Sequence, residues 1–131
     1  MPTADCPFCG LPEARIVLSD ELACVIRDGF PVAEGHSLVL PRRHVVSFFE
    51  TTRQEKESLL GLLERAKVEL ERSLNPAGYT IGINDGPAAG QTVPHLHIHL
   101  IPRYLGDVVD PRGGVRWVLP TKAAYRTSTG V

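Results

Sequence analysis

The sequence predicts one compact domain in which short β-strands are combined with a single long helix. Residues 94–102 alternate polar and apolar side chains without a break, which is the period of a half-buried strand. Residues 59–74 repeat leucine and alanine at intervals of three and four, which is the period of an amphipathic helix. With 131 residues, of which 43% are hydrophobic and 22% charged, the chain can bury a core but is short for a second domain.

Two cysteines three positions apart stand near the start of the chain. Cys6 and Cys9 enclose a proline and are followed by a glycine, so the backbone can turn and aim both thiolates at one centre. Two cysteines make only half of a tetrahedral zinc site, so two further ligands must come from elsewhere. A knuckle without metal and a thioredoxin-like dithiol remain alternatives, although the latter requires a preceding strand and none is predicted.

Residues 15–19 and 22–27 are rich in β-branched and apolar side chains and are separated by a short polar turn. They are predicted to pair as an antiparallel hairpin. Cys24 falls inside the second strand and is expected to be a small buried hydrophobe. Asp28 stands where this strand ends, either as a turn residue or as a carboxylate that meets a ligand.

Residues 35–41 are the next predicted strand, with one histidine at its start and another just beyond its end. A fully extended chain would hold His36 and His44 about 25 Å apart. They cannot share one site unless the chain bends. We therefore expect His36 near the catalytic face and His44 near the cysteine knuckle.

The long helix follows a possible short turn over residues 45–50. Thr52 and Glu55 have the spacing of a capping box, which marks the start of a helix. The apolar stripe is expected to pack in a core, within the chain or across a dimer, and residues 75–78 end the helix. The stripe consists of Leu59, Leu63, Ala66, Leu70 and Leu74.

A glycine-rich loop over residues 84–92 joins a predicted strand at 79–83 to the histidine-bearing segment. It matches neither a Walker loop nor a dinucleotide-binding loop, because it joins two strands and lacks the required lysine or helix. Its small residues allow backbone N–H groups to approach an anion, so a phosphate nest is one reading and a plain hairpin loop the other. Gln91 and Thr92 place an amide and a hydroxyl directly before the histidines.

Three of the five histidines of the chain share one face of the segment at 94–102. Same-face neighbours on a strand are about 7 Å apart, so His95, His97 and His99 could hold a metal ion or act on one phosphate. Metal hydrolases with such histidines usually add carboxylates and use scaffolds of about 250 residues, which this chain does not offer. A neutral imidazole is also a good nucleophile toward phosphorus, and a neighbouring imidazole can serve the leaving group.

The rest of the composition narrows the class of partner. Lysine and arginine number 14 against 15 acidic residues, so nothing suggests a nucleic-acid or membrane binder. No export signal or membrane span is visible, which makes a cytoplasmic location the expectation and a disulfide framework improbable. Residues 105–131 are expected to form a tail, with a short β-like piece around Trp117 that could stack on a base or bury at a subunit contact.

Residues 86–103 and 30–44 together resemble the histidine triad (HIT) family of nucleotide-binding proteins. The alternation of histidine and apolar residues from His95 onward fills every position of its motif. The resemblance covers about residues 6–104 and implies an α+β fold with an antiparallel sheet of about five strands, a long helix and a short helix. It also implies a homodimer.

The resemblance implies hydrolysis at the α-phosphorus of a purine nucleotide derivative, such as a dinucleoside polyphosphate, a nucleoside phosphoramidate or an adenylylated conjugate. His97 would be the nucleophile that forms a nucleotidyl-histidine intermediate. His99 would bind phosphate and assist the leaving group, and His36 would support the nucleophile. The implied nucleotide-binding and catalytic residues are Asp28, His36, Asn84, Gly90, Gln91, Thr92, His97 and His99.

In the zinc-bearing branch of the family, the resemblance implies a metal held by a Cys-x-x-Cys, a distal histidine and the first histidine of the triad. In this sequence those positions are Cys6, Cys9, His44 and His95. Such a site would be structural, because four protein ligands leave no open position for a substrate.

Three functions from different classes remain. The first is a nucleotidyl hydrolase that acts through His97. The second is a nucleotide sensor or regulatory dimer with little catalysis. The third is a small metalloprotein in which His95, His97 and His99 hold the metal without the cysteines.

Overall fold

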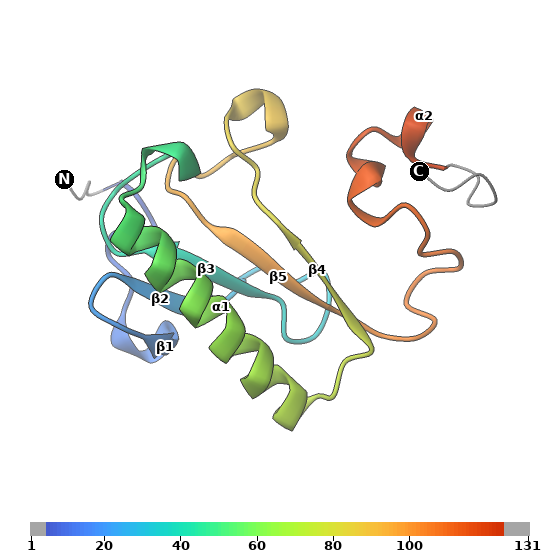
Figure 1. Ribbon diagram of the computed structural model, residues 1–131, viewed down its shortest axis with the longest axis horizontal. Coiled ribbons are helices and arrows are strands. Elements are labelled where there is room, and N and C mark those ends of the chain that lie inside the picture. Colours follow the sequence, from blue (N-terminus) through green and yellow to red (C-terminus); the bar gives the residue numbers. More distant parts are fainter. Residues whose placement is uncertain (1–4, 125–131) are drawn as a thin grey trace.

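One antiparallel sheet of five strands, in the order β1-β2-β3-β5-β4, forms the centre of the molecule (Figure 1). The computed structural model describes residues 5–124. The strands are β1 (Ile16–Ser19), β2 (Ala23–Arg27), β3 (Ser37–Pro41), β4 (Gly78–Gly82) and β5 (Ile98–Arg103), and the helices are α1 (Arg53–Ser73) and α2 (Pro120–Ala123). Four short 3-10 turns connect them, namely η1 (Glu13–Arg15), η2 (Phe48–Glu50), η3 (Pro87–Ala89) and η4 (Gly114–Val118). The predicted α+β fold, with its five-stranded antiparallel sheet, long helix and short helix, is confirmed.

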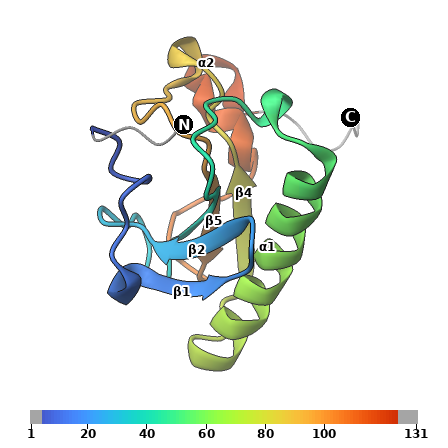
Figure 2. The ribbon, with the colours of Figure 1, turned by 90° about the vertical axis from the view of Figure 1, so that its left-hand side faces the viewer.

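The two faces of the sheet are covered by different parts of the chain. Helix α1 runs along one face, and the segment before β1 lies on the other (Figure 2). Because successive side chains of a strand point to opposite faces, alternate residues of β2 and β3 enter two separate cores. Val25 and Val39 pack on the helix side, whereas Cys24, Ile26 and Leu38 pack on the other side with Phe8 and Leu11.

Helix α1 begins as the sequence predicts. The Thr52 hydroxyl accepts from the Glu55 N–H at 3.0 Å, and the Glu55 carboxylate accepts from the Thr52 N–H at 2.9 Å. The same carboxylate receives two hydrogen bonds from the Arg43 guanidinium. The inner stripe is shifted slightly from the prediction, because Leu62 is fully buried while Leu63 and Leu74 are only partly buried.

The strand that carries the histidine motif is shorter than predicted, since β5 begins at Ile98 and not at residue 94. Before it, the Leu96 N–H donates to the Val45 carbonyl at 2.7 Å, outside the ladder that pairs His99 with Leu38. The alternation itself was predicted correctly, because Leu96, Ile98 and Leu100 all enter the core under α1. The histidines therefore face the side of the sheet away from the helix.

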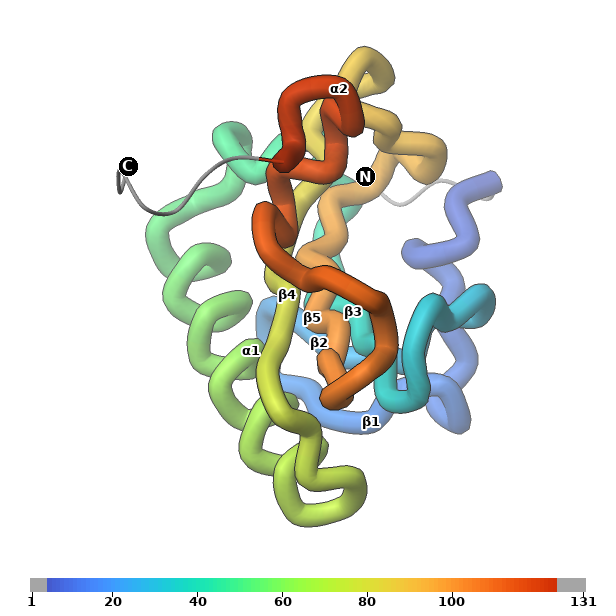
Figure 3. Tube along the Cα trace, turned by 90° about the vertical axis from the view of Figure 1, so that its right-hand side faces the viewer, coloured from blue at the N-terminus to red at the C-terminus, as the bar shows by residue number. Residues whose placement is uncertain are grey.

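The prediction of a β-like piece around Trp117 is wrong. Trp117 lies in the 3-10 turn η4, where its indole N–H donates to the Arg112 carbonyl at 3.0 Å. The segment after β5 crosses beside β4 and carries exposed apolar side chains, among them Leu105, Val109 and Val118 (Figure 3). Across residues 5–124, no helix has the length and apolarity needed to cross a bilayer.

A glycine fixes the approach of the helix to the start of β3. Gly35 has φ of +89°, a region that favours glycine, and a Cβ at this position would lie 2.8 Å from side-chain atoms of both Leu70 and Leu74. The end of α1 therefore packs directly on the backbone that precedes His36.

Candidate active site and metal centre

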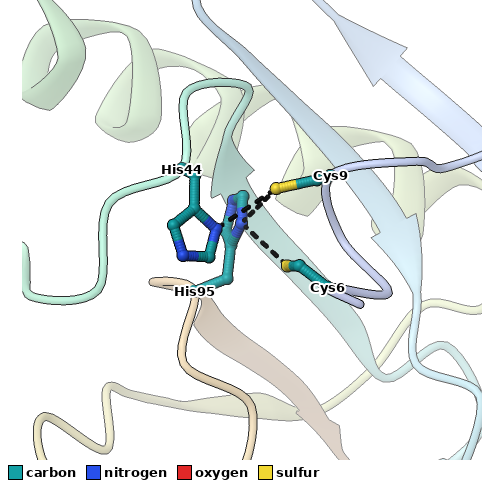
Figure 4. Close-up of side chains that lie close together, drawn as sticks. All are labelled: Cys6, Cys9, His44 and His95. Carbon is teal, nitrogen blue, oxygen red and sulfur yellow. Dashed lines mark hydrogen bonds between the residues drawn. The ribbon is translucent and has the colours of Figure 1, made fainter. Parts of the chain in front are cut away.

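Four side chains from three separate parts of the chain meet at one end of the sheet (Figure 4). Cys6 Sγ lies 3.4 Å from His95 Nδ1, and Cys9 Sγ lies 3.2 Å from His44 Nδ1 and 3.6 Å from His95 Nδ1. All four ligand atoms of this cluster lie within 4.8 Å of one another. The structure thus brings together the four residues that the sequence predicts as a metal site.

The donor chemistry of this cluster fits zinc. Sulfur and nitrogen ligands of a tetrahedral zinc ion are separated by about 3.6 Å, close to the Sγ···Nδ1 distances found here. His95 Nε2 lies 2.8 Å from the Pro41 carbonyl, which can only accept, so Nε2 carries the proton and Nδ1 keeps its lone pair for a ligand bond. Burial raises the pKa of the Cys6 thiol, and a bound cation would be needed to hold it as a thiolate.

The next histidine of the motif has the opposite ring orientation. His97 Nδ1 lies 2.8 Å from the backbone carbonyl of His95, so Nδ1 carries the proton and donates it. Its Nε2 therefore holds the lone pair that a nucleophile needs. The His97 ring lines a pocket of about 400 Å³.

The third histidine of the motif is bonded to His36. The Val32 N–H donates to His36 Nδ1 at 3.1 Å, so His36 Nε2 carries the proton and can donate to His99 Nδ1 at 2.9 Å. His99 then carries its own proton on Nε2. Asp28 lies beside this chain, with its Oδ2 3.3 Å from His36 Nε2.

The structure shows which ring His36 contacts. We expect it to support the nucleophile His97, and its ring contact is with His99, at a centroid separation of 5.2 Å. His99 in turn packs edge-on against His97, with centroids 5.1 Å apart. His36 therefore acts on the tautomer of His99 and reaches His97 only through it.

Burial favours the neutral forms of His36 and His99 near pH 7. It lowers the pKa of His36, although the nearby Asp28 carboxylate opposes the shift. Burial, followed by the neighbouring imidazoles of His97 and His36, also lowers the pKa of His99. Neutral rings with fixed tautomers offer one lone pair and one N–H in defined positions.

Most of the predicted nucleotide-binding residues line the same pocket as His97 and His99. Asp28 lies on one wall, and Asn84, Gly90 and Thr92 lie on another, in the loop between β4 and β5. The pocket therefore joins a carboxylate, an amide and a hydroxyl to the two histidines.

Gln91 is the exception among these residues. Its Oε1 accepts from the Gly86 N–H at 2.8 Å, and its Nε2 donates to the carbonyls of Val46 and Val93. It does not line the pocket. We expected it to bind phosphate, but its amide is fully used in holding the loop closed.

Several backbone N–H groups of the loop are bonded within it, although we expected them to be available to a phosphate. Gly86 and Gly90 have φ of +96° and +92°, which only glycine adopts without strain, and they flank the turn η3. The N–H groups of Ala89, Gly90 and Gln91 all bond to carbonyls inside the loop. These three donors are therefore not offered to an anion.

Sequence reasoning missed Phe8, which lies between the two cysteines and contacts both sites. Its ring is edge-on to His95 at 5.8 Å and to His97 at 5.2 Å, and it lines the pocket. Its position inside the Cys-x-x-Cys was the available signal. The carbonyls of Pro41 and His95, which fix the ring tautomers, leave no signal in side-chain types.

The three motif histidines do not form a metal cluster of their own. Across residues 5–124, the groups of three or more ligands that lie close together are the Cys6 cluster and the set of Asp28, His36 and His99. His95 turns toward the cysteines, while His97 and His99 face the pocket. The metalloprotein alternative, which required all three on one ion, is not supported.

Comparison with known proteins gives the family. The family described as "HIT domain" matches residues 12–106. An uncharacterized 16.1 kDa HIT-like protein of Mycoplasma pneumoniae is 36% identical over 108 residues, which cover 79% of this chain and 75% of that protein. The bifunctional bis(5'-adenosyl)-triphosphatase/adenylylsulfatase of Arabidopsis thaliana is 44% identical over 77 residues, 59% of this chain and 43% of that protein.

A solved structure extends the comparison to the fold. The crystal structure of a Zn-bound histidine triad family protein from Mycobacterium smegmatis superposes with a TM-score of 0.71 at 35% identity. It covers 81% of this chain and 80% of that chain. The chain therefore belongs to the HIT family, as its motif predicts, and relatives in this family include a dinucleoside polyphosphate hydrolase.

Proposed function

We propose that this protein is a nucleotidyl hydrolase that cleaves at the α-phosphorus of a dinucleoside polyphosphate or a nucleoside phosphoramidate. The observation that carries the proposal is the hydrogen bond from His97 Nδ1 to the His95 carbonyl. With Nδ1 bonded in this way, Nε2 of His97 is the ring nitrogen left to act as a nucleophile at the wall of a pocket of about 400 Å³. The activity of the Arabidopsis thaliana relative favours a polyphosphate substrate.

The reaction would proceed in two displacements. His97 Nε2 forms a bond to the α-phosphorus, and the bond to the leaving group breaks with its electron pair going to the departing oxygen or nitrogen. A water oxygen then bonds to phosphorus, the P–N bond breaks with its electron pair returning to Nε2, and the water proton passes to solvent. The Nδ1–H bond to the carbonyl remains in place and stabilises the positive charge on the ring of the intermediate.

His99 would hold the phosphate during both steps. With Nδ1 accepting from His36, its Nε2–H is free to donate to a phosphate oxygen or to the leaving group. The Thr92 hydroxyl would contact the phosphate from the loop, and Gly90, which has no side chain, would leave room for the nucleotide beside it. Asp28 would accept from the ribose hydroxyls.

Asn84 would contact the ribose or the phosphate from the same wall of the pocket. We assign the Cys6, Cys9, His44 and His95 cluster to a structural zinc ion. When bound, zinc would supply cross-linking of the knuckle to β3 and to the histidine motif, with no open position for substrate.

We further propose a single HIT domain with its core at residues 6–104, a tail at 105–131, a cytoplasmic location and a homodimer. The dimer is supported by the apolar side chains exposed on the tail, because Leu105, Val109 and Val118 are 94%, 106% and 76% exposed. A second copy of the chain would cover them. Light scattering on the purified protein would measure the assembly.

The function is tested by offering the purified protein diadenosine polyphosphates, adenosine phosphoramidate and aminoacyl-adenylate analogues, and by comparing kcat/KM. Mass spectrometry of acid-sensitive adducts after rapid quenching should locate the nucleotidyl group on His97. Tight binding of a purine mononucleotide without turnover of any compound above background would replace the hydrolase with a nucleotide sensor. Failure of both binding and turnover would reject the nucleotide site.

A further inference from the structure

Phe8 belongs to the metal knuckle by position and to the active site by contact. The Cys9 N–H donates to the Cys6 carbonyl at 3.2 Å, so the two cysteines close a tight turn around Pro7 and Phe8. The ring of Phe8 leaves this turn and meets the rings of His95 and His97 edge-on, at interplanar angles of 89° and 74°. One aromatic side chain is thus wedged between a metal ligand and the nucleophile.

We propose that Phe8 is a positioning residue for the nucleophile, and that the Cys6–Cys9 turn holds it against His97 only when a metal closes the knuckle. The inference rests on the proposed hydrolase function and assigns to the metal centre an influence on the chemistry next to it. The metal site would thus set the orientation of the His97 ring without touching the substrate.

Two connections run from the metal ligands to the nucleophile. The first passes through His95, whose Nδ1 faces the cysteines while its carbonyl accepts from His97 Nδ1. Rotation of that peptide would turn the carbonyl away and release the His97 tautomer. The second passes through the Phe8 ring, which lies edge-on against the His97 ring with centroids 5.2 Å apart.

The turn has few other anchors. Pro7 and Gly10 are exposed, Phe8 and Cys9 are half-buried, and the turn lies outside the sheet. Phe8 and Leu11 pack at the margin of the small core formed by Cys24, Ile26, Leu38 and Leu40. Ligand bonds from both cysteines to one ion would add a further restraint on the position of the Phe8 ring beyond this packing.

The expected consequence is on the chemical step. A nucleophile displaced by about 1 Å can lose up to about a hundredfold in rate, because the reacting atoms no longer meet in line. Phe8 also lines the pocket, so a role only in binding the nucleotide would appear in KM and in the affinity for AMP. The division between kcat and KM separates the two roles.

The test compares Phe8→Leu, Phe8→Tyr and Leu11→Ala with the wild type, all loaded with zinc. Leu11 packs on the same small core but is not among the pocket-lining residues, which makes it the matched control. Each protein is assayed for zinc content, melting temperature, AMP affinity, and kcat and KM on a diadenosine polyphosphate. Long-range ¹H–¹⁵N spectra of the histidine rings report the tautomer of His97.

Phe8→Leu should retain zinc and lose about tenfold or more in kcat, with KM and AMP affinity changed by less than about threefold, and its His97 should show mixed tautomers. Phe8→Tyr should recover most of kcat, and Leu11→Ala should melt earlier while keeping kcat within about twofold. Wild-type protein stripped of zinc, if it stays folded by circular dichroism, should show the same mixed His97 tautomers as Phe8→Leu.

The inference is overturned if Phe8→Leu keeps kcat and a single His97 tautomer, or if it changes only KM and AMP affinity. It is also overturned if folded, zinc-free protein retains the single tautomer of the loaded form. Inactivity of the zinc-loaded wild type would instead reject the proposed function. The tautomer spectra would still test the positioning role in that case.

Discussion

His95 and His97 are two residues apart on one segment, yet they are prepared for different chemistry. His95 is fully buried and donates from Nε2 to the Pro41 carbonyl, so its Nδ1 lone pair faces two thiols. His97 is half-buried and donates from Nδ1 to a carbonyl, so its Nε2 lone pair faces a pocket. The difference lies in which ring nitrogen is bonded to the backbone, and not in the residue type.

In His95 and His97, a backbone carbonyl determines which ring nitrogen carries the proton and which keeps its lone pair. A carbonyl accepts only, so each bond leaves the other ring nitrogen as a lone pair pointing away. His99 differs from both because its Nδ1 accepts from His36, which makes its Nε2 a donor. The three alternating histidines are thus bonded in three different ways, which fit the proposed roles of metal ligand, nucleophile and hydrogen-bond donor.

The largest expected effect is on the nucleophile. His97→Ala should lower kcat by about 10⁴-fold or more, equivalent to about 5 kcal/mol, because no other described group with a free imidazole lone pair faces the pocket in its place. AMP should still bind, as measured by calorimetry, since the walls of the pocket remain. Activity near the wild-type level would show that the two histidines are not divided in this way.

The next effect concerns the metal ligand cluster. Cys9→Ser should bind less than one zinc per chain by elemental analysis and lose about 3 kcal/mol or more of unfolding free energy, because the cross-link between the knuckle and His95 is lost. The same measurement on Cys24→Ser, a buried cysteine that is not part of the ligand cluster, serves as the control. Full zinc content in Cys9→Ser would contradict the assignment of the metal to the Cys6, Cys9, His44 and His95 cluster.

A smaller effect is expected at Glu55, which belongs to neither the pocket nor the metal-ligand cluster. Hydrogen bonds from Arg43 lower the pKa of this carboxyl from 4.5 to about 2. Its stabilising contribution is therefore complete above pH 4.5 and is lost as the pH falls toward 2, because the unfolded chain takes up the proton first. Glu55→Gln should cost about 2 kcal/mol at pH 7 in urea unfolding and leave kcat unchanged.

The smallest effect is the pH dependence that the neutral histidines impose on folding. Burial lowers the pKa of His36 and His99 below 6.5. As the pH falls below 6.5, the unfolded chain therefore binds more protons at these residues than the folded chain does. Stability is complete above pH 6.5 and falls as the pH is lowered, by less than about 1.4 kcal/mol per pH unit for each group. Urea unfolding between pH 7 and 5 should give a shallower slope for His36→Gln than for the wild type, and an unchanged slope would contradict the burial argument.

Much of the fold could be predicted from local patterns in the sequence. The capping box at Thr52 and Glu55, the helical stripe and the alternation after His95 each reflect interactions between near neighbours, and these hold in the structure. The start of β5 was placed four residues too early, because alternation does not reveal that Leu96 bonds to Val45 instead of entering the ladder. Trp117 was placed in β-like structure because an apolar run of that length fits either a strand or a short turn.

The candidate site could be predicted by side-chain type but not by bonding. The motif named the histidines, and the end-to-end argument separated His36 from His44, which the structure puts in different clusters. Neither the motif nor the distance argument could show that the Gln91 amide forms hydrogen bonds with three backbone groups or that His36 bonds to His99. Such contacts depend on chain segments that only the folded molecule brings together.

Gly35 links helix α1 to the histidines on the opposite face of the sheet. A methyl group there would lie too close to the side chains of Leu70 and Leu74, so the last turns of α1 and the peptide leading into His36 are closely packed. An alanine at this position would push the end of α1 away from the backbone and shift the segment that carries His36 toward or away from His99. The absence of a side chain at Gly35 is therefore expected to help keep His36 and His99 in their observed arrangement.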